Sequence, residues 1–173
     1  MGLVTIGIFS SSIQGILGSI VLMISHGITS GALFVAIGIL YERHHTRVVR
    51  YYSGLIHTMP LFSVCFIIFT LANLGLPCTS NFVGECFVIV GCFKVNSWSA
   101  FFAACGMVLG AGYSLWLCNR IIFGNVKQHS IVFFKDLDRR EFFIFLPFVF
   151  LTFLIGLYPD IVLNFVGSSF VSM

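Results

Sequence analysis

A single carboxylate inside a long apolar stretch most constrains what this chain can fold into. Glu85 is the only acidic residue between Glu42 and Asp136, and a carboxylate at membrane depth costs a few kcal/mol on insertion scales. Upstream of it, Gly75 and Pro77 interrupt the helical pattern, because proline lacks a backbone donor and clashes with the preceding turn. A broken membrane helix beside a buried acid is typical of ion and proton sites.

The composition indicates an integral membrane protein. Of the 173 residues, 58% are hydrophobic and 9% are charged, whereas a soluble domain carries about 25% charged residues. The net charge of +3 is too small and too dispersed for a nucleic-acid reader, so we expect no nucleic acid as a partner. The six cysteines show no metal-ligand spacing, which favours small buried side chains over a metal centre.

The uncharged stretches predict an all-α membrane fold with about four full transmembrane helices and a partial N-terminal one. Leu55 to Phe93 is longer than one straight span needs, which favours two half-helices joined by an unwound segment near Gly75–Ser80. Thr79, Ser80 or Asn81 is expected to cap the second half-helix. We treat residues 1–173 as one membrane domain. Its predicted spans are residues 1–12 (partial), 16–41, 58–93, 98–120 and 142–160.

Two stripes of small residues predict close contact between helices. Gly27 and Gly31 are four residues apart, and Gly106, Gly110 and Ser114 repeat the same spacing farther along the chain. Small residues at this spacing allow helix backbones to approach one another closely in a membrane.

His26 is the one ionisable residue of the span 16–41 and lies near its middle. Histidine titrates near neutrality, so a buried histidine suits a proton relay. The alternative is a structural histidine that bonds a neighbouring helix. Glu85 is likewise either a member of a proton relay or a structural residue that bonds a neighbouring helix. The residues alone do not decide between these two interpretations for His26 or for Glu85.

The basic residues predict an orientation in the membrane. If the intervening spans alternate in direction, the loops 42–50 and 120–141 lie on one side, and only Lys94 lies on the other. By the positive-inside rule the basic side faces the cytoplasm or the mitochondrial matrix. The basic residues of the two loops are Arg43, Arg47, Arg50, Arg120, Lys127, Lys135, Arg139 and Arg140.

Three motifs carry a resemblance that covers essentially the whole chain. They are Met-Ile-Ser-His-Gly-Ile-Thr-Ser-Gly-Ala-Leu-Phe at 23–34, Tyr-Glu-Arg-His-His-Thr-Arg at 41–47, and Leu-Gly-Leu-Pro-Cys-Thr-Ser-Asn-Phe-Val-Gly-Glu at 74–85. Together they resemble the antiporter-like subunits of respiratory complex I, and most closely the subunit 4 group, which bacteria encode as chain M. The sister subunits 2 and 5 usually carry a lysine in place of Glu85, which supports the subunit 4 group.

The resemblance implies a location and a role. It places the chain in the C-terminal part of a subunit built from two inverted repeats, in the mitochondrial inner membrane with the loops 42–50 and 120–141 facing the matrix. By position, His26 maps to the histidine of the family's central polar axis and Glu85 to its terminal glutamate. The chain would then contribute the second-half proton relay and exit of a proton-translocating NADH:ubiquinone oxidoreductase. The family's first repeat is missing. We expect a split subunit whose N-terminal part is a separate polypeptide, and the alternative is that the sequence is a fragment of the full subunit.

The resemblance also implies partners and excludes cofactors from this chain. NAD, FMN, iron–sulfur clusters and ubiquinone would be bound elsewhere in the complex, so the chain would belong to an enzyme without holding a redox centre. The implied partners are the N-terminal part of subunit 4, the antiporter-like subunits 2 and 5, and lipids, with cardiolipin as a candidate. Two alternatives stay open: a subunit of an Mrp-type cation/proton antiporter, and a purely structural membrane scaffold.

Overall fold

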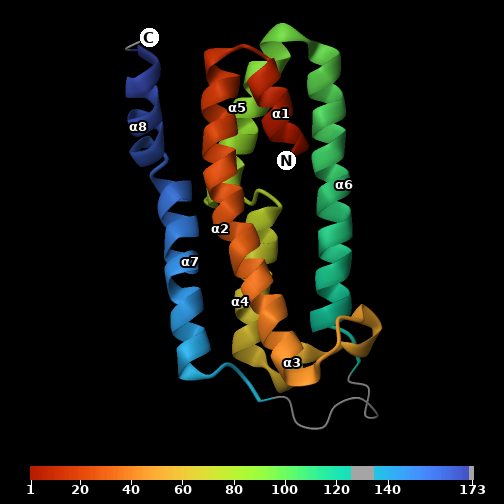
Figure 1. Cartoon of the computed structure of the whole chain (residues 1–173). Helices are drawn as coiled ribbons and strands as arrows, with labels where there is room; N and C mark the ends of the chain where they lie inside the picture. The colour runs from red at the N-terminus through yellow and green to blue at the C-terminus, as the bar shows by residue number, and fades with distance from the viewer. Residues whose placement is uncertain (126–134, 172–173) are drawn as a thin grey trace.

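The computed structural model describes residues 1–125 and 135–171. All regular structure in these two segments is helical, and the long helices stand side by side in an elongated bundle (Figure 1). The elements are α1 (Gly2–Phe9), α2 (Ile13–His44), the 3-10 helix η1 (Val49–Tyr51), α3 (Leu55–Thr58), α4 (Pro60–Asn73), α5 (Ser80–Val95), α6 (Ser97–Ile122), α7 (Arg139–Leu157) and α8 (Asp160–Val171).

Within the described residues, three helices are long and apolar enough to cross a membrane, namely α2, α6 and α7. The shorter apolar helix α4 is followed by α5, and the six residues 74–79 between them are not helical. The expected all-α membrane fold with one discontinuous helix is therefore confirmed.

The break between α4 and α5 is built from two left-handed residues. Gly75 and Cys78 both have a φ of 73°, a conformation that costs little at glycine and more at other residues. The expected side-chain cap on α5 is wrong. Thr79 occupies the N-cap position, but its hydroxyl donates to the Leu76 carbonyl at 2.6 Å and does not bond the first turn of α5.

The largest interface joins α2 to α5, and glycines bring the two helices together. A Cβ atom at Gly84 would lie 2.9 Å from the Leu22 backbone, and one at Gly91 would lie 2.7 Å from the Gly15 Cα. Of the pair Gly27 and Gly31, only Gly31 faces another helix in the part of the chain that the structure describes. A Cβ atom there would lie 3.6 Å from the Phe148 ring of α7, whereas nothing lies within 4 Å of one at Gly27.

The two glycines of the predicted stripe on α6 do not contact another helix in the part of the chain that the structure describes. Among the described residues nothing lies within 4 Å of a Cβ at Gly106, and the nearest atom to one at Gly110 belongs to Tyr113 of the same helix. Gly106 and Gly110 line the cavity, whereas Ser114 is buried. The sequence period alone therefore did not identify the glycines at which helices meet.

One half of the bundle, toward α3, has a continuous apolar core. Leu55, Met59, Phe62 and Phe69 are fully buried there between the second half of α2, the end of α6 and the start of α7. The rings of Phe69 and Phe145 lie 5.8 Å apart between centroids, which ties α4 to α7. This half carries the hydrophobic packing of the fold.

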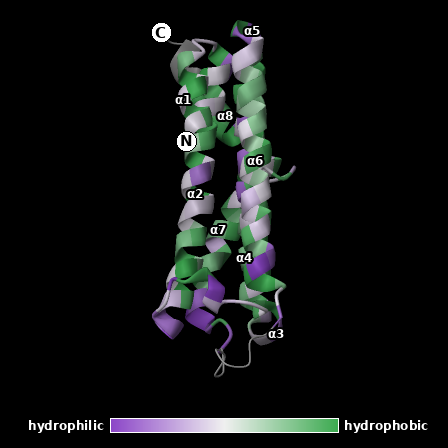
Figure 2. Cartoon of the chain, turned by 90° about the vertical axis from the view of Figure 1, so that its right-hand side faces the viewer, coloured by the Kyte–Doolittle hydropathy of each residue, from purple (hydrophilic) through white to green (hydrophobic). Residues whose placement is uncertain are grey.

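The same end of the bundle gathers the hydrophilic residues (Figure 2). Arg43 at the end of α2 pairs with Glu141 at the start of α7 at 2.6 Å, and both side chains are largely buried. The Asp136 carboxylate accepts hydrogen bonds from the backbone N–H groups of Leu61 and Phe62 in the first turn of α4. The loops that were predicted to share one side therefore meet at one end, although Lys127 lies outside the described residues.

Candidate functional site

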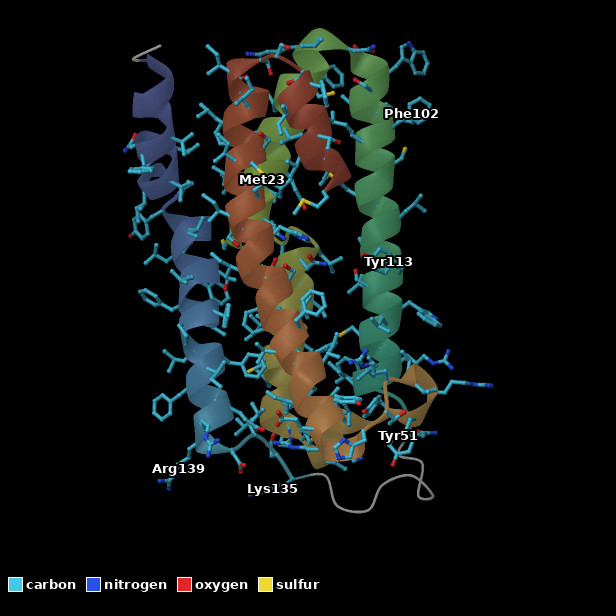
Figure 3. All side chains as sticks on the ribbon, viewed as in Figure 1. Met23, Tyr51, Phe102, Tyr113, Lys135 and Arg139 are labelled. Atoms are coloured by element: carbon cyan, nitrogen blue, oxygen red, sulfur yellow. The ribbon has the colours of Figure 1, made fainter. Side chains whose placement is uncertain are left out.

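A cavity of about 640 Å³ occupies the half of the bundle away from α3. It lies between α1, the first half of α2, the α4–α5 break and α6, and Figure 3 shows two of its lining residues, Phe102 and Tyr113, along α6. Most of the lining is apolar. The lining side chains that can form hydrogen bonds through N–H or O–H groups or a carboxyl are His26, Asn73, Asn81, Glu85, Ser99 and Tyr113.

Glu85 reaches this cavity from α5 and is only 9% exposed. Its carboxyl rests against the α4–α5 break, where a Cβ atom at Gly75 would overlap the Oε2 atom of Glu85. Glycine is therefore required at position 75 for two reasons. Its backbone is left-handed, and a side chain there would overlap the Glu85 carboxyl. Within residues 1–125 and 135–171 the carboxyl forms no hydrogen bond or ion pair, so it needs a proton or water from the cavity.

His26 lines the same cavity from α2 and is half-buried. Its backbone carbonyl accepts a hydrogen bond from the Ser30 hydroxyl at 2.6 Å. The imidazole forms no hydrogen bond with the neighbouring helices in the described part of the chain. The two residues singled out from the sequence, His26 and Glu85, therefore come together on one cavity from two different helices.

Four buried polar residues join α2 to the first turn of α5. The Ser25 hydroxyl donates to the Ser80 carbonyl at 3.0 Å, and the Asn81 amide donates to the Thr29 hydroxyl at 3.4 Å. All four side chains are at most 2% exposed. These contacts hold the start of α5 at the level of His26, because Ser25 and His26 are neighbours on α2.

Sequence reasoning did not identify Asn73 and Asn81 as cavity residues. Asn81 was considered only as a helix cap, whereas its side chain lines the cavity and is 2% exposed. Asn81 and Glu85 are four residues apart, which puts them on one face of α5. This spacing in the sequence could have linked Asn81 to Glu85. On α6, Tyr113 lines the cavity, and the Ser114 hydroxyl donates a hydrogen bond to the Gly110 carbonyl.

Residues 1–110, which carry both His26 and Glu85, match the family described as "NADH:quinone oxidoreductase/Mrp antiporter, TM". The chain belongs to this family. The match includes α1 to α5 and the first half of α6, and therefore nearly all of the cavity lining.

The relatives of this antiporter-family chain are longer proteins. It is 56% identical to the NADH-ubiquinone oxidoreductase chain 4 of Marchantia polymorpha over 98% of this chain and 34% of the relative. For the NADH-quinone oxidoreductase subunit M of Rhodobacter capsulatus the identity is 47%, over 98% of this chain and 33% of the relative. The chain thus spans about a third of the length of the curated relatives that it matches.

A solved structure shows the same arrangement of helices. The chain matches one chain of the structure titled "Respiratory complex I from Thermus thermophilus with bound NADH" with a TM-score of 0.89 and 29% sequence identity. The match covers 99% of this chain and 37% of that one. The helical bundle therefore has a fold that is shared with a respiratory complex I chain.

Proposed function

We propose that this chain forms the second-half proton relay and exit of a subunit 4 channel in proton-translocating NADH:quinone oxidoreductase. The main support for the proposal is the cavity that Glu85 and His26 share. Glu85 is the only carboxylate of the central membrane region, and His26 is the only histidine in the apolar stretch of α2. Proton transfer needs donors and acceptors that are linked through a polar path.

In this role His26 passes a proton to Glu85, and Glu85 releases it toward the positive side of the membrane. The cavity is large enough to hold several water molecules, which share about 30 Å³ each in the liquid. Water bridges the two side chains in this proposal. Because neither side chain has a protein partner in the described residues, both are available to exchange a proton with water.

The surroundings of the chain follow from the same proposal. The end that carries Arg43, Arg139 and Arg140 faces the mitochondrial matrix, in keeping with the positive-inside rule. The partners are the remainder of subunit 4, other membrane-arm subunits that include subunits 2 and 5, and lipids such as cardiolipin. The chain holds no redox group itself, and NAD, FMN, iron–sulfur clusters and ubiquinone are bound by other parts of the complex.

A second candidate is a subunit of an Mrp-type cation/proton antiporter, which the description of the matching family also names. Purification of the native assembly separates the two, since redox subunits accompany the chain in complex I and are absent from an antiporter. A scaffold that has lost transport is the third possibility. It is excluded if substitution of Glu85 changes proton translocation in an intact complex.

The test of the proposed function is Glu85→Gln in the complex that contains this chain. The amide keeps the size of the side chain but cannot carry the proton, so we expect proton translocation into proteoliposomes to be lost or strongly reduced while the complex still assembles. Glu42→Gln is the matched control, because Glu42 is exposed at the charged end of α2, outside the cavity. Normal translocation by the Glu85→Gln complex would refute the relay.

A further inference from the structure

Asn81 presents a buried acceptor that the described part of the chain leaves unused. Its Oδ1 atom has no hydrogen-bond partner there and is inaccessible to solvent, although the side chain lines the cavity. A buried polar atom without a partner is costly and uncommon in folded proteins. This atom therefore points to a partner that is present in another state of the site.

The orientation of the Asn81 amide is fixed by Thr29. The Thr29 hydroxyl donates to carbonyl groups one turn back on α2, to Ser25 at 3.2 Å and to His26 at 3.4 Å. Its hydrogen is thus engaged, and only its lone pairs are left for Asn81. The amide N–H of Asn81 must face Thr29, and the Oδ1 atom must face the other way as an acceptor.

Glu85 is the donor that suits this acceptor, and only in one protonation state. It lies four residues after Asn81 on the same face of α5, a spacing at which polar side chains hydrogen-bond along a helix. A protonated carboxyl group offers one O–H donor, whereas a carboxylate is an acceptor only and is repelled by the amide oxygen.

We propose that Asn81 is a positioning residue whose amide oxygen accepts a hydrogen bond from Glu85 when Glu85 carries the proton. The carboxyl then has two places, one against the α4–α5 break at Gly75, where it is seen here, and one against Asn81. Loss of the proton removes the donor and returns the carboxyl to the break. The inference rests on the proposed function, because it requires Glu85 to be protonated during turnover.

Infrared difference spectroscopy of the assembled complex during turnover tests this inference. The carboxylic C=O band that disappears in Glu85→Gln is the band of protonated Glu85. In Asn81→Leu, which has no acceptor, we expect that band to move to higher wavenumber. We expect proton translocation to slow by about five-fold, as for the loss of one net hydrogen bond. Ser80→Ala is the matched control, since Ser80 also has a buried hydroxyl oxygen without a partner in the described residues but does not line the cavity.

Thr29→Val is the second variant, in case Asn81→Leu fails to assemble. It leaves Asn81 in place but frees its amide to rotate, so we expect a smaller shift of the same band and a smaller loss of translocation. A Glu85 band that stays in place in both variants would overturn the inference, since another donor would then use the amide oxygen. Absence of any band sensitive to Glu85→Gln would instead contradict the proposed function itself, so the two failures are distinguishable.

Discussion

The half of the bundle toward α3 is packed with large apolar side chains, whereas the other half contains a cavity. Toward α3, large side chains such as Phe62, Phe69 and Phe145 fill the space between α2, α4, α6 and α7. Toward the opposite end, glycines bring α2 and α5 into backbone contact, and α6 lines another side of the cavity. Small residues therefore bring two helices together where they face a backbone, as between α2 and α5, whereas the glycines of α6 line the cavity.

The division also separates two kinds of requirement. In the packed half a residue is needed for its volume, since truncation leaves a cavity that the neighbours only partly fill. In the hollow half a residue is needed for the groups that it presents to the cavity, and the neighbouring glycines are needed because they have no side chain. Substitutions in the two halves should therefore fail for different reasons.

The largest loss of stability is expected for Phe69→Ala in the packed half. Phe69 is fully buried between α4 and α7, and removing a buried phenylalanine side chain costs about 3–5 kcal/mol. We expect a lower melting temperature of the complex in detergent and a lower yield of assembled complex. Phe101→Ala is the control, because Phe101 is 57% exposed on α6. Equal melting temperatures for the two variants would show that the packed half does not carry the stability.

A smaller loss is expected for Gly84→Ala at the α2–α5 contact. Its Cβ atom would meet the Leu22 backbone at 2.9 Å, and such overpacking costs about 1–3 kcal/mol. Gly27→Ala should be neutral or slightly stabilising, because its Cβ has open space among the described residues and alanine favours the helix. Thermal melting of the two variants side by side measures the difference. A Gly27→Ala variant that is less stable than Gly84→Ala would contradict the assignment of the close contact.

The broken helix was predictable from the sequence because its causes are local. Gly75 and Pro77 disrupt the helical pattern whatever surrounds them, and the apolar stretch on either side exceeds one membrane thickness. The all-α membrane fold follows from the length of the uncharged stretches for the same reason. Both features depend on residues that are close in the chain.

The packing contacts and the polar surroundings of Glu85 were not predictable, because they depend on which faces of distant helices meet. Gly27 and Gly31 have the four-residue spacing of a packing motif and Gly84 and Gly91 do not, yet only the second pair meets the backbone of another helix. Likewise Asn81 could have capped α5. Thr79 turned toward Leu76 instead, and Asn81 was held by Thr29 of α2.

The smallest effect is expected at Asp138, which is exposed where α7 begins. Asp138 and Glu141 form a capping box, in which the Asp138 N–H donates to Glu141 at 2.8 Å. The Lys135 ammonium lies 2.9 Å from the Asp138 carboxyl, and its hydrogen bond, followed by its charge, lowers the pKa of that carboxyl below the ordinary value. A lowered pKa in the folded state means that this stabilisation is present above the ordinary pKa and is lost as the pH falls through the lowered one.

Asp138→Asn imitates the protonated state at neutral pH. Asparagine is also a good N-cap residue, so the helix should keep its first turn and lose only the ion pair and the favourable charge at its start. We expect a slight increase in amide hydrogen exchange in the first turn of α7, with the melting temperature of the complex nearly unchanged. Lys135→Met should produce a similar increase, and the double variant should add nothing further, since both changes remove the same pair. If the effects of the two substitutions add, Asp138 stabilises α7 through its charge at the helix start and not through the ion pair with Lys135.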